Sequence, residues 1–461
     1  MRILWLVAAV VATVAVPLSA LHTENTTGVL SLAGDGGAGG SGGGADVITT
    51  PSFTISQPGS GIAESAGEPG LGINWNTGMG MFQSYTSTYR VNFGTNPPTW
   101  TIAKPLWSQI NVDPVLFMDS ATGRTFAGGL SGTCSLVGIT DNDGGLWIPG
   151  ADMCANPGWD HPTIGGGPWA SPISTAPSYS HSVYYCSQTG LSPGPAWCAV
   201  SPDGGLTFDP AVPIWTTQCA GLHGHVKVGP DGAAYVPDKN CSGKAGVSVS
   251  TNNGLTWSVK TIAGSNTADE SDPSVAIGRG NLVTGGRVYM CWQGSNGHAY
   301  AASSANKGTS WSTPVDIGAA FGIQNIQFPA AVAGDDDRAA CAFLGTPTSG
   351  DDQSSSFNGA WHMYVAYTFD SAATWTTIDT TPSDPVQRGC IWLGGGSNAC
   401  RNLLDFNDAQ IDSNGRVYVG FADGCTSTNC ISGSNSPKQF AEKGTIAYQT
   451  GGSSLYASFN G

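Results

Sequence analysis

The sequence predicts an all-β protein assembled from repeated units of short strands. Three observations support this expectation. Short alternating or aromatic-rich runs bounded by Gly, Asn, Asp and Pro occur throughout the body, and no convincing amphipathic helix interrupts them. One eight-residue pattern recurs five times. Charged residues make up only 11% of the chain, so Gly, Ser, Thr and Asn fill the surface, as expected for short strands joined by many turns.

The recurring pattern is clearest in residues 201–208, Ser-Pro-Asp-Gly-Gly-Leu-Thr-Phe, which fit Ser-x-Asp-x-Gly-x-Thr-aromatic at each defined position. The short Asp side chain accepts backbone N–H groups within a tight turn, and Gly tolerates a positive φ. The terminal aromatic ring buries a large apolar face. Looser copies occupy residues 140–147, 250–257, 304–311 and 368–375, so that successive copies start 61, 49, 54 and 64 residues apart.

Each copy closes a longer unit of three expected strands. In the clearest unit these are residues 272–277, 288–292 and 299–303, and the first strand begins with an acidic residue before Pro273. Further units begin near Glu68, Asp113, His161, His225, Phe328 and Asp405, giving seven units of about 59 residues. Four-stranded blades around a central channel need somewhat fewer residues, and loops absorb the surplus. We therefore expect a seven-bladed β-propeller over residues 47–461, with six blades as the alternative.

These five segments and the three-strand units resemble the Asp-box (BNR-repeat), sialidase-like β-propellers over roughly residues 65–456. The resemblance implies that the boxes are structural outer turns, and it leaves activity open, because the superfamily includes sialidases, other glycoside hydrolases and non-enzymatic binding propellers. Its sialidases use three arginines, a Tyr–Glu nucleophilic pair and an Asp acid/base, and the first arginine lies in a Phe-Arg-Ile-Pro-like motif. This chain has Leu71-Gly72-Ile73-Asn74 in that area, so the sialidase catalytic set is not transferred to it.

The N-terminus has the features of an export signal. Arg2 precedes an uncharged apolar run to Val16, and a small residue stands at position 20, where a peptidase could cut. We expect a signal peptide at residues 1–20 and a Gly-rich flexible linker at residues 21–46, and hence a secreted protein. The alternative is an uncleaved segment that retains the protein at the cell surface.

All 12 cysteines lie between Cys134 and Cys430, and an even number behind a signal peptide predicts a disulfide framework. A zinc site is the weaker interpretation, because the sequence has no Cys-x-x-Cys pair. Short spacings suggest five local bridges and leave one long one. The expected pairs are Cys134–Cys154, Cys186–Cys198, Cys219–Cys241, Cys390–Cys400, Cys425–Cys430 and Cys291–Cys341.

The charge of the chain excludes one class of partner. Its formal net charge is −15, and only 17 Lys and Arg residues occur without any basic cluster. Nucleic acids and anionic lipids are recognised through clustered basic residues, so we expect neither as a partner. No segment after the signal is apolar for long enough to enter a membrane stably. Nothing in the sequence indicates an oligomeric state.

Candidate functional residues lie where the innermost strand of each unit begins, because those starts face the channel of a propeller at one end. They are rich in carboxylates and imidazoles in a chain with seven histidines. We assign Asp113, Asp272 and Asp408 as candidate catalytic carboxylates, which could act as acid and base on a glycosidic bond. The candidate ligand-binding residues at these starts are Glu68, Asp160, His161, His223, His225 and Asp405.

Three candidates surround the expected Cys390–Cys400 loop. Arg388 and Arg401 could bind a carboxylate or pin the Gly-rich loop, and Trp392 could stack on a sugar ring. No cofactor is required, but two metal interpretations remain. His223 and His225 could bind a divalent metal with Asp160 or His161. Asp335-Asp336-Asp337 could bind calcium, although such a run is more often a solvated turn.

The first functional hypothesis is a secreted propeller that binds glycans or glycoproteins at its central face, with glycoside hydrolase activity as an extension. The second is a non-catalytic extracellular scaffold or adhesion module. A concave channel mouth holding two carboxylates about 5 to 10 Å apart favours the hydrolase. A mouth plugged by loops or aromatic side chains leaves binding only. A third interpretation is that the polar starts simply hydrate the channel.

Overall fold

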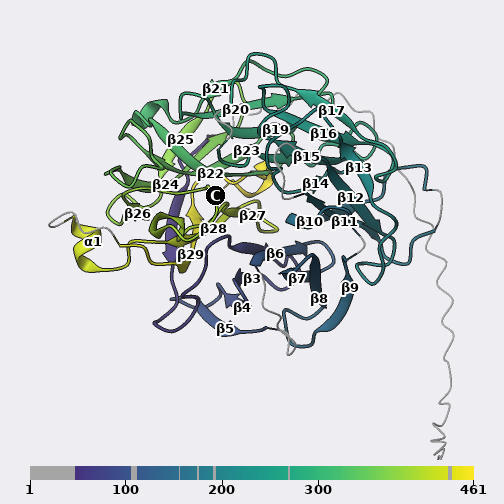
Figure 1. The fold of residues 1–461 in the computed structure, drawn as a ribbon, viewed down its shortest axis with the longest axis horizontal. Helices are drawn as coiled ribbons and strands as arrows, with labels where there is room; N and C mark the ends of the chain where they lie inside the picture. The colour runs from purple at the N-terminus through teal and green to yellow at the C-terminus, as the bar shows by residue number, and fades with distance from the viewer. Residues whose placement is uncertain are drawn as a thin grey trace, which may run out of the picture. The chain divides into compact units, whose positions relative to one another are not determined.

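Seven antiparallel sheets arranged in a ring make up the structure, which is a computed structural model (Figure 1). It describes residues 47–104, 112–154, 156–173, 176–189, 194–267, 270–433 and 439–460. The expected signal peptide at 1–20 and linker at 21–46 lie outside these residues. The prediction of a seven-bladed β-propeller is confirmed, and the six-bladed alternative is wrong.

Each blade is a sheet of four strands whose first strand is the innermost, except that blade 6 has a fifth strand, β26, paired with β24. Blade 1 comprises β2 (Gly70–Ile73), β3 (Met79–Ser84), β4 (Ser87–Asn92) and β5 (Thr99–Ile102). Blade 2 comprises β6 (Val112–Asp119), β7 (Arg124–Ser131), β8 (Cys134–Thr140) and β9 (Ile148–Asp152). Blade 3 comprises β10 (Asp160–Pro168), β11 (His181–Gln188), β12 (Ala196–Ser201) and β13 (Val212–Trp215). Blade 4 comprises β14 (Lys227–Val228), β15 (Ala234–Asp238), β16 (Gly246–Ser250) and β17 (Ser258–Thr261).

The remaining blades complete the ring. Blade 5 comprises β18 (Ser274–Ile277), β19 (Val288–Gln293), β20 (Ala299–Ser304) and β21 (Val315–Asp316). Blade 6 comprises β22 (Asn325–Ala333), β23 (Ala339–Thr346), β24 (Ala360–Thr368), β25 (Thr376–Asp379) and β26 (Gln387–Arg388). Blade 7 comprises β27 (Asp408–Ile411), β28 (Val417–Asp423), β29 (Lys443–Gly451) and β1 (Ser52–Ser56), and the short helix α1 (Thr428–Ser432) follows β28. None of the described helices is both long and apolar enough to cross a bilayer.

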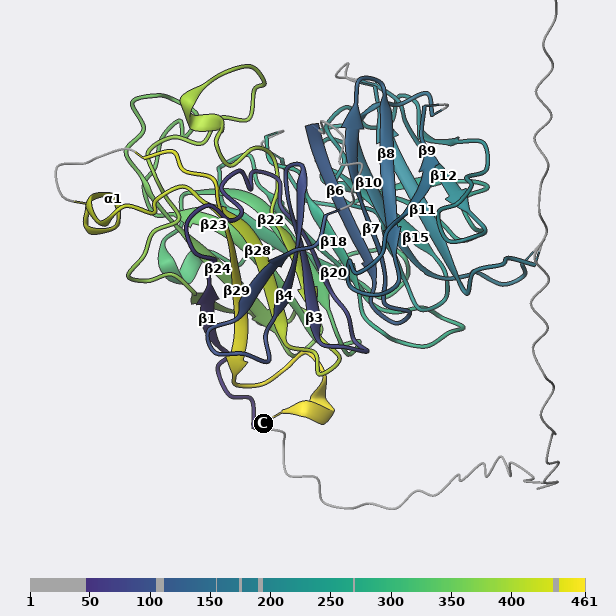
Figure 2. The ribbon, with the colours of Figure 1, turned by 90° about the horizontal axis from the view of Figure 1, so that it is seen from below.

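Blade 7 closes the ring by pairing the two ends of the described chain. Its outermost strand, β1, pairs with β29, so the first described strand completes a sheet whose other strands come last in the sequence. The inner strands then contact one another in chain order, and β27 contacts β2. Figure 2 shows blades 2 and 3 from their edge, with β6 to β12 side by side.

Glycine allows the inner strands to approach one another closely. A Cβ atom at Gly72 of β2 would lie 2.5 Å from the Cβ of Met118 in β6. A Cβ at Gly165 of β10 would lie 2.2 Å from the carbonyl oxygen of Val226, next to β14. Because no real side chain tolerates such distances, a larger residue at either position would push neighbouring blades apart.

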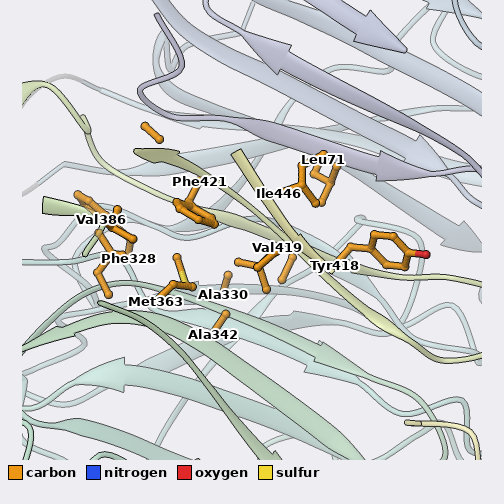
Figure 3. Packing of buried hydrophobic residues seen from close by; sticks show 14 of the residues in the cluster. Leu71, Phe328, Ala330, Ala342, Met363, Val386, Tyr418, Val419, Phe421 and Ile446 are labelled. Atoms are coloured by element: carbon orange, nitrogen blue, oxygen red, sulfur yellow. The ribbon is translucent and has the colours of Figure 1, made fainter. Parts of the chain in front are cut away.

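Apolar side chains fill the space between adjacent blades. The largest cluster joins blades 1, 6 and 7, and Figure 3 shows Leu71, Phe421 and Ile446 within it. Each of these side chains is at most 1% exposed. Burying a side chain of this size contributes about 1.5 to 3 kcal/mol, so the sheet-to-sheet contacts supply much of the driving force for folding.

The five eight-residue segments form the same turn between the third and fourth strands of blades 2 to 6. In residues 201–208 the Ser201 hydroxyl donates to Asp203 Oδ1 (2.8 Å) and accepts from the Gly205 N–H (2.7 Å). Asp203 Oδ1 also accepts from the Thr207 N–H (2.8 Å). In the other four segments the first hydroxyl accepts from the N–H four positions later at 2.9 to 3.1 Å. The expected turn chemistry is therefore present in every copy.

The expected disulfide framework is also present. The six bridges are Cys134–Cys154, Cys186–Cys198, Cys219–Cys241, Cys291–Cys341, Cys390–Cys400 and Cys425–Cys430, as predicted. No cysteine among the described residues is free. Five of the bridges link residues within about 20 positions of each other, whereas Cys291–Cys341 joins blade 5 to blade 6.

Candidate functional site

The inner strands begin with a repeated backbone distortion. The pairing of the first two strands slips around Asp113, His161 and Phe328, each of which precedes a proline. Their φ angles of +49°, +53° and +59° lie in the left-handed region, as does that of Glu68 at +54°. Such a conformation costs a non-glycine residue about 1 to 3 kcal/mol and often occurs where a side chain must be aimed at a site.

Residues from these starts assemble one cluster, which we call the start ring: Glu68, Asp113, Asp160, His161, Asp272, Arg401 and Asp405. Glu68 is only 3% exposed and hydrogen-bonds to the carboxyl group of Asp405. Burial raises the pKa of Glu68 well above its usual value, and the nearby charges of Asp405 and Asp113 raise it further. Glu68 is therefore a buried carboxyl group whose protonated form is favoured by burial and by its acidic neighbours.

Arg401 holds Asp405 in a bidentate pair. The two guanidinium nitrogens lie 2.6 and 2.8 Å from the two carboxylate oxygens, and one of them also donates to the carbonyl oxygen of Leu393 (3.1 Å). Both side chains keep partial exposure, 19% and 16%. Arg401 therefore orients Asp405 and pins the neighbouring loop, which is the structural role expected from the sequence, and its binding of a ligand carboxylate stays a prediction.

Asp113 is the half-buried carboxylate between these groups and the histidines. Burial raises its pKa, and the charges of Asp160 and Asp405 raise it further, whereas His161 acts in the opposite direction. Asp160 is likewise half-buried at the first position of β10. Together with Asp405 they present three partly exposed carboxyl groups at the channel mouth.

A buried ion pair joins blades 3 and 5 beneath these carboxylates. His161 Nε2 lies 2.7 Å from Asp272 Oδ2, and Lys239 Nζ lies 3.4 Å from Asp272 Oδ1. Burial alone would lower the pKa of His161, but Asp272 raises it to about 9. Burial alone would raise the pKa of Asp272, but His161 and Lys239 lower it to about 2. The pair is therefore charged at neutral pH.

The other two histidines of this region, His223 and His225, are neutral at pH 7. Burial, together with the positive charges of His161 and Lys227, lowers the pKa values of His223 and His225 to about 3. The His223 ring contacts the His161 ring at 5.3 Å, and its Nδ1 lies 3.0 Å from the carbonyl oxygen of Gly224. The sequence-based prediction that these imidazoles gather at the channel is therefore consistent with their positions, whereas their protonation states differ from that of His161.

Phe406 narrows the channel beneath the start ring. Its ring centroid lies 4.5 Å from that of His225 and 6.3 Å from that of His161. The cavity that Phe406, His225 and Asp272 help to line has a volume of about 20 Å³. A space of that size holds about one water molecule, so the neck admits no sugar residue.

Asp408, Arg388 and Trp392 have other contacts. The carboxylate of Asp408 accepts the N–H groups of Leu71 (2.9 Å) and Ala409 (2.8 Å), which ties blade 7 to blade 1. Arg388 donates to the carbonyl oxygens of Cys430 (2.6 Å) and Ile431 (3.2 Å), in and beside the end of α1. The Trp392 indole N–H donates to the carbonyl oxygens of its own loop, at Gly394 and Gly395. These contacts favour structural roles for all three.

The candidate metal ligands do not converge in the described residues. The one group of three donors whose atoms lie within 4.8 Å of one another is Cys219, Asp238 and Cys241, and the two cysteines form a disulfide. In the Asp335–Asp337 run, Asp335 pairs with Arg279 (2.6 Å) and accepts the N–H of Ala457 (2.6 Å). The carboxylate of Asp336 accepts the Arg287 N–H. These contacts occupy oxygens that a calcium ion would need.

Tryptophans divide into packed and exposed groups. Trp147 and Trp361 are buried, and their N–H groups donate to backbone carbonyls. Trp159 is 40% exposed and immediately precedes Asp160 of the start ring. An exposed indole can stack on one face of a sugar, and the carboxylates of the start ring can accept hydrogen bonds from hydroxyl groups.

Sequence reasoning missed two residues of this region. Lys239 directly follows β15, the second strand of blade 4. In an antiparallel blade the end of the second strand lies beside the start of the innermost strand, so the position of Lys239 in the sequence could have placed it near the start ring. Phe406 lies between Asp405 and Asp408, and its hydrophobicity alone did not distinguish it from a core residue. A separate pocket of about 590 Å³, lined in part by Trp292, Tyr300 and Trp311, was also not anticipated.

Comparison with known proteins finds similarity to solved structures only. No protein-family model matches the sequence, and no curated protein is similar to it in sequence. Among solved structures, a copper-bound fungal alcohol oxidase of the AA5 family aligns with 87% of this chain and 76% of its own, at 11% identity and a TM-score of 0.50. A Dyadobacter fermentans protein of unknown function aligns with 86% and 98%, at 13% identity and 0.43. The Aleuria aurantia lectin in complex with Fucα1-6GlcNAc aligns with 68% and 96%, at 15% identity and 0.43.

The chain is a seven-bladed β-propeller. At these identities the likenesses extend to the fold alone, so the Asp-box family stays a resemblance based on the five turns. The chemistry of this propeller has to be argued from its own residues.

Proposed function

We propose that this protein is an exported carbohydrate-binding propeller whose ligand lies over the start ring. The observation that carries the proposal is the cluster of partly exposed carboxyl groups of Asp113, Asp160 and Asp405, with the exposed Trp159 next to Asp160 in the chain. Sugars present apolar C–H faces and adjacent hydroxyl groups, which suit an aromatic surface and fixed carboxylates respectively. Six disulfides are typical of oxidising compartments and support export.

Glycoside hydrolysis is the second candidate. It is favoured by Glu68, because burial and the nearby charges of Asp405 and Asp113 raise its pKa well above the usual value, as a general acid requires. Two observations weigh against it. Arg401 occupies both oxygens of Asp405, and Phe406 fills the neck below, so little of the pair is open to a substrate. Binding without hydrolysis, as in a scaffold or adhesion module, is therefore our preferred form of the proposal.

The test is a glycan-array screen followed by calorimetric titration of the best ligand. We expect Trp159→Ala and Asp113→Asn each to weaken binding at least tenfold. Tyr300→Ala, in the separate 590 Å³ pocket, serves as the matched control and should bind like the wild type. Retained affinity in both start-ring variants, or an array without any ligand, overturns the proposal. Loss of binding only in Tyr300→Ala would assign the ligand to the outer pocket instead.

Two further arms separate the alternatives. Hydrolysis is measured as release of nitrophenol from a panel of nitrophenyl glycosides and of sialic acid from sialosides. The variant Glu68→Gln should abolish any activity that depends on the carboxyl group of Glu68. The proposal needs no cofactor. Repeating the titration with calcium and with a chelator measures whether a divalent cation contributes, and Asp335→Asn examines the acidic run.

A further inference from the structure

The channel has a second opening, where the inner strands end. A pocket of about 430 Å³ lies there, and all seven blades contribute to its lining. It is distinct from the start ring, because β6, for example, begins at Val112 beside that ring and reaches this pocket with Phe117 and Asp119. We call it the exit pocket. Its volume falls within the range of small-molecule sites.

Apolar side chains form most of the wall. They come from the last residues of five inner strands: Phe117, Val228, Ile277, Val332 and Ile411. Trp75 and Tyr456 also line the pocket, with their ring centroids 6.4 Å apart. Such a wall favours an apolar body, because burial of apolar surface away from water is favourable.

Lys227 supplies an available positive charge. Lys227 lines both the exit pocket and the neck above it, and no hydrogen bond or ion pair of its ammonium group is recorded among the described residues. The other charged groups at the pocket are already engaged. Arg279 lies 2.6 Å from Asp335, and Asp119 accepts from the hydroxyl of Tyr179 (2.7 Å) and contacts His181 (2.8 Å).

An unpaired ammonium group within a mostly apolar pocket favours an anion over water or a neutral molecule. Asp408, which lines the neck with Lys227, does not fill this role, because its two oxygens accept the N–H groups of Leu71 and Ala409. Burial raises the pKa of Asp408 and lowers that of His225, and the nearby charge of Lys227 acts to lower both. Its charge therefore acts on both sides of the neck.

We propose that the exit pocket binds a small amphiphilic monocarboxylate, with the carboxylate on Lys227 and the apolar body along the wall. This site differs in place and chemistry from the carbohydrate site above, so the two proposals stand or fall separately. A neutral sugar matches the exit pocket poorly, because the wall offers few groups that bond hydroxyls. A lone inorganic anion would leave the wall uncovered.

The experiment compares decanoate with decan-1-ol by calorimetric titration of the full-length protein. Wild-type protein should bind decanoate, and Lys227→Met should weaken that binding at least tenfold while leaving decan-1-ol affinity within about twofold. Lys244→Met is the matched control, since Lys244 is an exposed lysine outside the pocket. It should bind decanoate like the wild type.

A second variant guards against a change in folding. Ala121 lies exposed at the rim of the pocket, and Ala121→Trp should obstruct both decanoate and decan-1-ol without touching the neck. Decanoate affinity that is equal in wild type and Lys227→Met overturns the proposal, as does failure of the wild type to bind decanoate at millimolar concentration. Glycan binding measured on the same samples reports on the start ring alone, so failure of one site is distinguishable from failure of the other.

Discussion

Residues other than glycine adopt the left-handed backbone conformation in two contrasting regions of this propeller. In the outer turns, Asp143, Asn253, Lys307, Ser371 and Ala372 have φ between +52° and +72°. At the inner-strand starts, Glu68, Asp113, His161 and Phe328 have φ between +49° and +59°. The backbone conformation is the same in both regions, whereas what the side chains do with it differs.

In the outer turns the hydrogen bonds repeat from blade to blade. A hydroxyl, an Asp or Asn and the backbone satisfy one another locally in each of the five copies, so the turn depends little on its neighbours. At the inner starts the backbone repeats but the residue does not, and carboxyl, imidazole and phenyl groups meet across blades. Turns that repeat both their residues and their hydrogen bonds are therefore assigned to the scaffold. Strand starts that repeat the backbone conformation but carry different residues are assigned to the candidate site.

The largest difference between the regions should appear when a carboxylate is neutralised. Asp272→Asn leaves Lys239 buried without its partner carboxylate, and we expect a loss of about 3 to 5 kcal/mol in the free energy of unfolding. Asp141→Asn is the outer control, because Asp141 pairs with Arg124 but its side chain is 59% exposed. Its loss should be below about 1 kcal/mol. Urea denaturation at pH 7 measures both, and equal losses would contradict the distinction between the regions.

The second prediction concerns alkaline pH. The folded-state pKa of His161 is about 9, above its unfolded value of about 6.5, so its pair with Asp272 stabilises fully below about pH 6.5. That stabilisation is lost as the pH rises through about 9. Between pH 6 and 10 the wild type should therefore lose about 2 to 3 kcal/mol more than His161→Gln. Parallel pH profiles of the two proteins in urea denaturation would refute the charged pair.

The third prediction concerns an outer turn that fits the pattern at every position. Asp203→Ala removes the acceptor for the Thr207 N–H and hydroxyl (2.8 and 2.6 Å), and we expect a loss of about 1 kcal/mol because these bonds are exposed. Glycan and decanoate affinities should not change, since residues 201–208 line neither the neck nor the exit pocket. Thermal and urea denaturation measure the stability, and altered ligand affinity would show that the boxes do more than support the fold.

Much of the scaffold could be predicted from the sequence because its signals are local. The turn pattern, the spacing of its copies and the close pairs of cysteines each depend on residues near one another in the chain. Seven blades and six disulfides followed from them. The inner-strand starts were also located, because a polar residue directly before proline recurred at the head of four of the seven units.

Partnerships within the site could not be predicted, since they depend on how blades rotate around the channel. Asp272 and Asp408 look alike in the sequence, but Asp272 contacts His161 across two blades and Asp408 turns to the backbone of Leu71. The unpaired Lys227 was equally hidden, because the absence of a partner is a property of packing. Residue type located the region, and three-dimensional contact alone assigned the roles.

The smallest effect is expected in the one outer turn that has no glycine at the fifth position of the pattern. The fifth copy has Ala372 at φ +72° where the other copies have Gly, so Ala372→Gly should relieve strain and raise the free energy of unfolding by about 0.5 to 1 kcal/mol. Gly254→Ala in the third copy is the reciprocal change. Its Cβ would lie 2.7 Å from Val200 Cγ2, and it should lower the stability by more than about 1 kcal/mol.

Urea denaturation of these two variants decides whether the outer strain is an isolated defect. A gain for Ala372→Gly means that the turn tolerates Ala only because its hydrogen bonds hold the backbone in place. A loss means that the Ala372 side chain contributes packing, since it belongs to a buried cluster with Tyr289 and Ala339. In that case the left-handed residues of the outer turns would not be strained scaffolding, and strain could no longer be compared between the two regions.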